Sequence, residues 1–417
     1  MRLEVYHILT AILSITALVG FINARYIKLP TTIAIMGGAL LLALFLLIVG
    51  QFGYAEFEQN LANALIRLDF HDILMQGMLS FLLFAGALTI DINYLRACKW
   101  EILVLATLST LTSTFIVGAG AYYLLNFVFN ITIPFIHCLL FGALISPTDP
   151  IAVLAIFKEI AAPKKLEVIV AGESLFNDGV AIVLFLTIYQ VAFGTGDNPS
   201  HWYNVVQLFT QQALGGITYG ALLGYLGYYL IKQIDDYKVD VLITVAMVTG
   251  GYYIAELLEI SGPLAMVVAG IMLGNHGKLF SIPRKTQVEL DNFWELVDEI
   301  LNALLFFLLG LEFLVIMPTQ WQLLAGIMTI PLVLIIRFIT VGMPMWWFKN
   351  FKKYPPHVIK ILTWGGLRGG LAVALALALP RSEYRGLILT MTYCVVIFAI
   401  LVQGLSIKRL AIASKQH

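Results

Sequence analysis

A short polar sequence, "AGESLFNDG", occupies residues 171–179 within a long apolar run. Its two acids, Glu173 and Asp178, each cost roughly 2.5–3.5 kcal/mol at the centre of a bilayer. On a helix, Ser174 and Asp178 lie four residues apart and share one face. Asn177 falls on the same face as Glu173 for the same reason. Such a helix offers carboxylate, hydroxyl and amide oxygens at membrane depth, which suits a hard monovalent cation or a proton.

Two further segments contain residues that interrupt helices inside apolar runs. Pro147 and Pro150 of "SPTDP" (146–150) remove backbone donors, and "WGGLRGGLA" (364–372) contains four glycines. Irregular backbone at membrane depth is tolerated only where it is buried in protein or lines a cavity. Carbonyls beside Asp149, including that of Thr148, are therefore expected to be free to act as ligands.

Deep within the predicted spans, away from most of the other charged residues near span ends, lie three acids and two arginines, which must face one another or water. The excess of one negative charge suits one monovalent cation or one proton. Glu173 either pairs with an arginine or contacts the ion, and Arg337 is expected to pair with Glu173 or Asp149. Arg368 is expected to offset the carbonyl end of a half-helix, and Asn177 either satisfies free backbone or binds the ion. The five charged residues are Asp149, Glu173, Asp178, Arg337 and Arg368.

The composition is that of a polytopic membrane protein, since 60% of the 417 residues are hydrophobic and only 12% are charged. Equal numbers of acidic and basic residues, 25 of each, give no indication of a nucleic-acid partner. The three cysteines are isolated, so neither a bound metal nor a redox cofactor is expected. We predict an all-α fold in one transmembrane domain, without a soluble regulatory domain. Apolar runs predict thirteen spans: 5–22, 31–50, 72–90, 101–124, 134–157, 166–193, 204–231, 239–258, 260–275, 292–316, 321–348, 357–379 and 386–406.

Alternate loops carry most of the lysines and arginines, which places the N-terminus outside and the C-terminus in the cytoplasm. The interrupted spans 134–157 and 357–379 are seven spans apart and cross in opposite directions. Two inverted six-span repeats joined by span 204–231 would produce this pattern. Such repeats are typical of secondary transporters whose site lies where the broken helices meet. The sequence thus predicts a transporter rather than an enzyme.

The acids at the start of span 292–316 leave two interpretations open. Asp291, Glu295 and Glu299 recur every four residues, so they share one helical face. They either line a funnel that attracts ions or form a face wetted by water.

"SPTDPIAV", "AGESLFNDGVAIVLF" and "WGGLRGGLAVALAL" make the sequence similar to the monovalent cation:proton antiporter-1 family, the NhaP-type sodium/proton exchangers. "FLLFAGALTIDINYL" (81–95) and the arginine in "LIIRFITVG" (334–342) support this resemblance, which runs through nearly the whole chain. The Asn177-Asp178 pair implies electroneutral exchange of Na+ for H+, with a role in pH homeostasis. The resemblance implies that Arg337 pairs with Glu173 and that the ion ligands are Asp178, Asp149, Ser174, Glu173 and Thr148.

The resemblance also implies an arrangement of the spans and a setting for the protein. A moving core would comprise about 101–193 and 321–406, and interface spans about 5–90 and 239–316, with 204–231 as the linker. A homodimer in a prokaryotic plasma membrane is implied, and the transported ions, not a cofactor, would occupy the site.

Two other functions are compatible with part of the sequence, one more closely than the other. A K+/H+ antiporter of the same fold is the nearer one, because one sequence does not fix the selectivity among Na+, Li+ and K+. An intramembrane aspartyl protease is the other, since Asp149 and Asp178 lie on neighbouring spans. Neither acid lies in a Gly-x-Gly-Asp setting, and two arginines in the core do not suit a peptide site.

Overall fold

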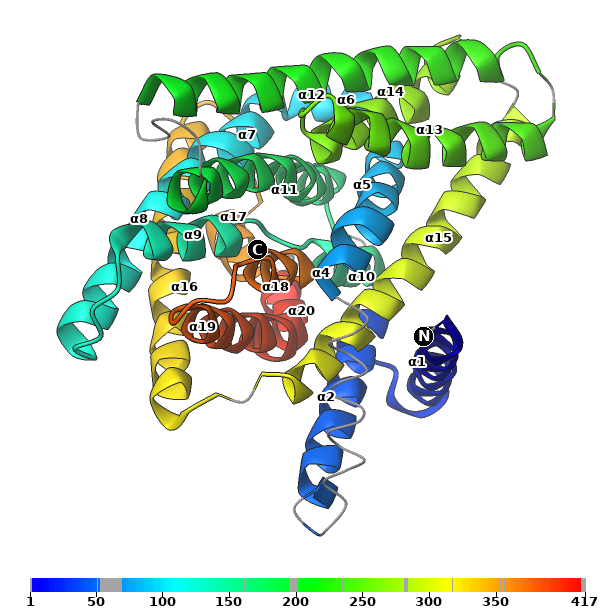
Figure 1. Cartoon of the computed structure of the whole chain (residues 1–417). Helices are drawn as coiled ribbons and strands as arrows, with labels where there is room; N and C mark the ends of the chain where they lie inside the picture. The colour runs from blue at the N-terminus through cyan, green and yellow to red at the C-terminus, as the bar shows by residue number, and fades with distance from the viewer. Residues whose placement is uncertain are drawn as a thin grey trace.

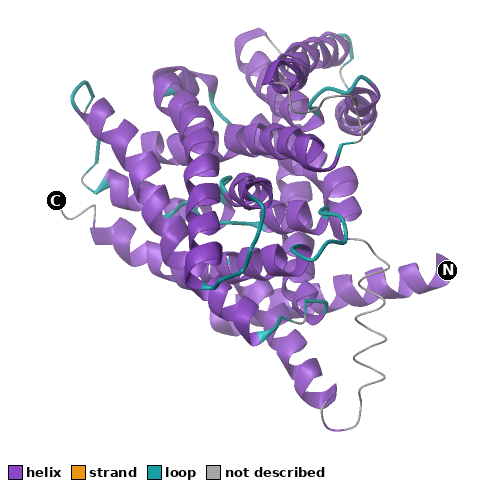
Figure 2. Ribbon diagram, turned by 60° about the vertical axis from the view of Figure 1, so that its left-hand side comes forward, coloured by secondary structure: helices purple, strands orange, loops and turns teal. Residues whose placement is uncertain are grey.

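The structure is a computed structural model of the whole chain. It describes residues 2–50, 52, 70–160, 162–194, 202–234, 236–280, 284–316, 318–352, 354–355 and 357–413. Within these ranges the chain consists of helices joined by short loops and contains no strand (Figure 2). The predicted all-α fold is therefore confirmed for the described residues.

Each predicted span corresponds to a helix or to a pair of short helices. The first half of the chain comprises α1 (Arg2–Ile22), η1 (Asn23–Ile27), α2 (Thr31–Val49), α4 (Phe70–Asp72), η3 (Ile73–Met78), α5 (Leu79–Leu88), α6 (Ile92–Ala97), α7 (Lys99–Leu103), η4 (Val104–Ser109), α8 (Thr110–Tyr123), η5 (Leu124–Val128), α9 (Phe135–Ile145), α10 (Ile151–Glu159) and α11 (Lys164–Phe193). The second half comprises α12 (Trp202–Ile231), α13 (Tyr237–Leu257), α14 (Gly262–Phe280), α15 (Arg284–Leu311), η6 (Glu312–Leu314), α16 (Gln320–Lys349), α17 (Val358–Trp364), α18 (Gly370–Leu377), α19 (Arg385–Phe398), η7 (Ala399–Gln403) and α20 (Gly404–Ala413).

Helix length in the described part of the chain identifies fewer membrane crossings than the thirteen apolar runs of the sequence predict. Among the described residues, nine helical stretches are long and apolar enough to cross a membrane by length and composition. The remaining predicted spans are α14, the acidic α15 and the two pairs of short helices, α9 with α10 and α17 with α18. The count of thirteen crossings therefore stays a prediction.

The helices pack in two groups. In one group α12, α13 and α14 lie side by side along the top of Figure 1, and α14 also packs on α5. In the other group α8 packs on α9, and α16 packs on α19. The long helix α15 runs diagonally from the first group to α2. The predicted division into a moving core, an interface and a linker stays a prediction.

Both predicted helix breaks are present. The first lies between α9 and α10, where Pro147 and Pro150 lack the N–H groups that a continuous helix needs. The second lies between α17 and α18, where Gly369 has an extended backbone with φ −118° and ψ −160°. The two unwound segments meet as a single antiparallel bridge, in which the Asp149 N–H donates to the Leu367 carbonyl at 2.8 Å. Residues far apart in the chain thus cross at one point.

A buried carboxylate ties the segment after α16 to the start of α7. Glu101 has no exposed surface, and its Oε1 accepts hydrogen bonds from Lys352 Nζ at 2.8 Å and from the Tyr354 hydroxyl at 2.5 Å. Lys352 Nζ also donates to the Ala97 carbonyl at 3.0 Å. Burial, together with the bond to Glu101, raises the pKa of Tyr354. This cluster fixes one end of α16, which carries Arg337.

Candidate ion-binding site

The crossing of the two broken helices is held by a buried arginine. Arg368, 2% exposed, donates from Nη1 to the carbonyls of Ser146 and Pro147, the latter at 2.7 Å. These carbonyls follow the C-terminal end of α9, where helical carbonyls lack backbone partners. Arg368 therefore lies at the carbonyl end of a half-helix, and that half-helix, α9, belongs to the other break.

Asp149 is fixed at the crossing through its backbone and its side chain. Its N–H bonds to Leu367, and its Oδ1 accepts the N–H of Ile151 at 3.0 Å. Its Oδ2 lies so close to Gly369 that a Cβ at position 369 would overlap it. The missing side chain at Gly369 therefore leaves the room that the carboxylate of Asp149 occupies.

Gly369→Ala should displace the Asp149 carboxylate and abolish or strongly reduce Na+-driven H+ flux, because an extended backbone accepts alanine but the crossing does not accept its methyl group. Gly250→Ala is the matched control, since a Cβ there would meet nothing within 4 Å. Both variants should be assayed for transport after reconstitution, with thermal stability measured in parallel. Full activity of Gly369→Ala would show that the position of the Asp149 carboxylate does not matter.

A hydrogen-bonded cluster joins α11 to the first break. Asn177 donates from Nδ2 to Thr148 Oγ1 at 2.9 Å and accepts the Thr148 N–H at 3.3 Å. The Thr148 hydroxyl also lies 3.0 Å from Ser174 Oγ. All three residues are at most 3% exposed. Asn177 therefore satisfies free backbone at the break, which is one of the two roles that the sequence left open.

A cavity of about 770 Å³ reaches the crossing from one side of the molecule. Thr148, Asp149 and Asp178 line it, so the two acids of the neighbouring spans face a shared space that is large enough for several water molecules. Among the described residues that line this cavity, Glu173, Ser174 and Asn177 are not found. The structure thus separates the predicted ligands into Thr148, Asp149 and Asp178, which line the cavity, and the remaining side chains, which do not.

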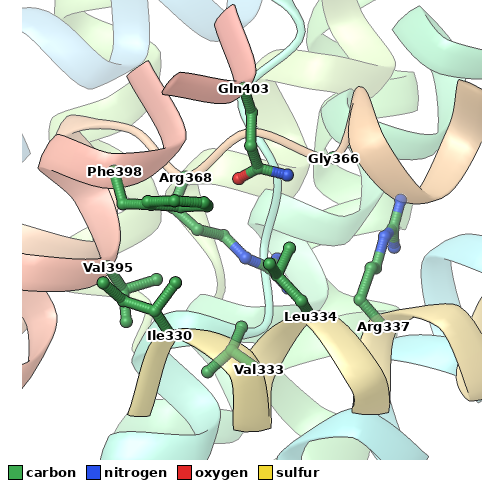
Figure 3. A pocket seen from close by; sticks show the side chains of 9 residues that line it. All are labelled: Ile330, Val333, Leu334, Arg337, Gly366, Arg368, Val395, Phe398 and Gln403. Atoms are coloured by element: carbon green, nitrogen blue, oxygen red, sulfur yellow. The ribbon is translucent and has the colours of Figure 1, made fainter. Parts of the chain in front are cut away.

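Glu173 and Arg337 form an ion pair behind this cavity. Arg337 Nη1 lies 2.6 Å from Glu173 Oε1, and the two side chains are 6% and 2% exposed. Arg337 Nη2 also donates to the Leu362 carbonyl at 3.3 Å. Figure 3 shows Arg337 rising from α16 toward Gly366, beside a pocket of about 10 Å³ that it lines together with Arg368. The predicted pair of Arg337 with Glu173 is therefore present, and the geometry favours an arginine partner over an ion ligand for Glu173.

Sequence reasoning missed two polar residues of the cavity wall. Asp298 and Asn302 of α15 line the cavity, as do Glu295 and Glu299. The spacing of 295, 299 and 302 marks one helical face, and Asp298 lies on the same side. The four-residue spacing of Asp291, Glu295 and Glu299 indicated this face, but Asp298 and Asn302 are not part of that spacing. Glu295 and Glu299 line the cavity and are exposed to solvent, so both interpretations of the α15 acids, the funnel and the wetted face, stay open.

Comparison with known proteins gives consistent results over the full length of the chain. Residues 12–413 match the family model described as "Sodium/hydrogen exchanger, transmembrane". The chain is 45% identical over 405 residues to the Na(+)/H(+) antiporter NhaP of Pseudomonas aeruginosa, covering 96% of this chain and 95% of that protein. It is 34% identical over 397 residues to the Na(+)/H(+) antiporter NhaH of Halobacillus dabanensis, covering 93% and 92%. The fold resembles the sodium proton antiporter MjNhaP1 of Methanocaldococcus jannaschii at pH 8, with a TM-score of 0.77, 19% identity, and 99% and 98% coverage.

Proposed function

Because the chain belongs to the family of transmembrane sodium/hydrogen exchangers, we propose that it exchanges Na+ for H+ across a bacterial plasma membrane. The chain is an integral membrane protein, with several helices apolar and long enough to cross a bilayer. One observation carries the proposal: Asp149 and Asp178 share a cavity at the crossing of two broken helices. Transporters place their coupling-ion sites where such helices meet.

Exchange follows from competition for these two carboxylates. A Na+ ion that has shed part of its water would bind to ionised Asp149 and Asp178 and to oxygens at Thr148, which are hard ligands. Protonation of a carboxylate removes a negative charge that the cation needs, so the site holds either the ion or a proton. Ser174 and Asn177 hold Thr148 in place, and the Glu173–Arg337 pair holds α11 against α16.

The purified full chain in proteoliposomes tests the proposed function. A pH gradient should be dissipated on addition of Na+, and Li+ and K+ should be compared in the same preparation. Dissipation by K+ but not by Na+ would make the chain a K+/H+ antiporter. Failure of all three cations to move protons would overturn the proposal.

Exchange should be electroneutral, with one Na+ for one H+, because the three acids and two arginines that the sequence places at membrane depth carry one excess negative charge. The rate of Na+-driven proton movement should therefore be unchanged when the membrane potential is set to different values with a gradient of a permeant anion. The Asn177-Asp178 pair, through its family resemblance, supports the same stoichiometry. A clear dependence of the rate on voltage would indicate a second transported proton.

The predicted orientation and assembly are also part of this proposal. The cavity is lined by Lys158 and Lys164, which lie at the end of α10 and the start of α11, in a connection between predicted spans that the positive-inside rule assigns to the cytoplasm. The cavity would therefore face the cytoplasm in this conformation. The homodimer implied by family resemblance stays a prediction.

A further inference from the structure

One face of α15 forms the cavity wall opposite the broken helices. It carries Glu295, Asp298 and Glu299, followed by Asn302 one turn further on. The next cavity-lining residue of this helix, Leu305, packs at the start of α18, because a Cβ at Gly370 would lie 2.6 Å from Leu305 Cδ1. Gly370 follows Gly369, which borders the Asp149 carboxylate, so this polar face leads from the mouth of the cavity toward the crossing.

The outer end of this face is at the surface. Glu295 faces Lys158 at 3.9 Å, and these side chains are 61% and 76% exposed. Asp298 is half-buried, and Asn302 is only 3% exposed. Asp298 and Asn302, four residues apart, span about 6 Å along the helix axis. The pair therefore lies between the solvated mouth and the depth of Asp149.

Asn302 has an unused acceptor. Asn302 lies four residues after Asp298, so the two side chains share one face of α15. Asn302 Oδ1 is buried and has no hydrogen-bond partner within the described part of the chain. A buried polar oxygen without a partner is unfavourable unless a ligand or water satisfies it. The residue that carries this unused oxygen lines the cavity, as does the Asp298 carboxylate one turn earlier.

We propose that Asp298 and Asn302 form a second Na+ site, in which an ion rests before it moves to Asp149 and Asp178. The Asp298 carboxylate supplies the charge, and Asn302 Oδ1 replaces one water of the ion's hydration shell. Carboxylate, amide oxygen and retained water form the all-oxygen ligand set that a hard cation takes. This inference rests on the proposed function, because it identifies an intermediate site on the path to the exchange site.

Equilibrium binding of radioactive Na+ to the purified full chain tests the site without requiring transport. The wild-type protein should bind two Na+ ions at saturation, and the double variant Asp149→Asn/Asp178→Asn should bind one. Adding Asp298→Asn to that double variant should abolish binding. A double variant that binds no Na+ would overturn the second site, as would unchanged binding after the Asp298 substitution. Absence of exchange by the wild-type protein would instead overturn only the proposed function.

Transport kinetics separate this site from a general effect of negative charge. Asp298→Asn and Asn302→Leu should each raise the apparent KM for Na+ about tenfold, the usual scale for one lost contact to an ion. Glu299→Gln is the matched control, because it removes a charge next to Asp298 from the same cavity, at an exposed position with Ala303 instead of an amide one turn on. An equal rise of KM in Glu299→Gln would overturn the site in favour of a diffuse electrostatic funnel.

A conservative substitution guards against loss of folding. Asn302→Ser keeps an oxygen and should retain a lower KM for Na+ than Asn302→Leu, with similar melting temperatures for the two variants. Equal KM values for the serine and leucine variants would show that the oxygen at position 302 does not bind the ion.

Discussion

Asp178→Asn should abolish Na+-driven H+ flux while the protein stays folded. The amide has nearly the same volume as the carboxyl group, so the packing of α11 is preserved, but it does not titrate and carries no negative charge to balance a cation. Asp178 lines the cavity together with Asp149. The negative charge lost from Asp178 would not be replaced by a neighbouring group unless the site itself changed. The measurement is fluorescence-detected pH-gradient dissipation in proteoliposomes, with melting temperature as the test of folding.

Asp91→Asn is the matched control for Asp178→Asn. Asp91 lines the same cavity, but it lies before α6, where its side chain caps the helix by accepting the Asn93 N–H at 2.8 Å. Asparagine caps helices about as well as aspartate, so this variant should keep both stability and transport. Substantial Na+-driven flux in Asp178→Asn, or equal loss in both variants, would contradict the assignment of Asp178 as the carboxylate that exchanges ion and proton.

Loss of either member of the Glu173–Arg337 pair should destabilise the protein by about 3–5 kcal/mol, the usual cost of leaving one buried charge uncompensated. The pair is nearly without exposed surface, and its atoms lie 2.6 Å apart, so water does not take the place of the missing partner. Arg337→Ala and Glu173→Gln should each lower the melting temperature, and the double variant should cost less than the sum of the two.

A surface pair provides the control for this double-mutant cycle. Lys408 and Glu159 also form an ion pair, but their side chains are 45% and 57% exposed, and such pairs contribute at most about 1 kcal/mol. Glu159→Gln should therefore change the melting temperature little. Strictly additive losses for Arg337 and Glu173 would show that the two residues do not interact. A Glu173→Gln variant with full stability but a raised KM for Na+ would restore Glu173 as an ion ligand.

The breaks and the buried charges could be predicted from sequence because both violate strong rules for membrane helices. Proline at positions 147 and 150 and clustered glycine at 365–370 are incompatible with regular helices, so the positions of the breaks follow from local chemistry. Charged residues at membrane depth need partners for the same general reason. These rules did not decide which partner each residue would take: they left Arg337 between Glu173 and Asp149, family resemblance implied Glu173, and the structure contains that pair.

The role of α15 could not be predicted from local pattern alone. Its acids lie near the end of a span, where a solvated position costs little, so no rule required them to face a cavity. Asn302 carries no charge, and an asparagine within a span usually satisfies another polar group. Its unused Oδ1 is a property of the packed structure, because it depends on where α15 meets the start of α18.

The bonds from Arg368 to the first break also constrain how the protein is made. Ser146 leaves the ribosome 222 residues before the arginine that satisfies its carbonyl. At synthesis rates of about 5–20 residues per second, this interval lasts about 10–45 s. During that time the carbonyls of Ser146 and Pro147 need water or a temporary partner, because lipid offers no hydrogen-bond donor. The first half of the chain therefore has to stay incompletely inserted, or be shielded by the insertion machinery, until the second half has been synthesised and Arg368 can bond these carbonyls.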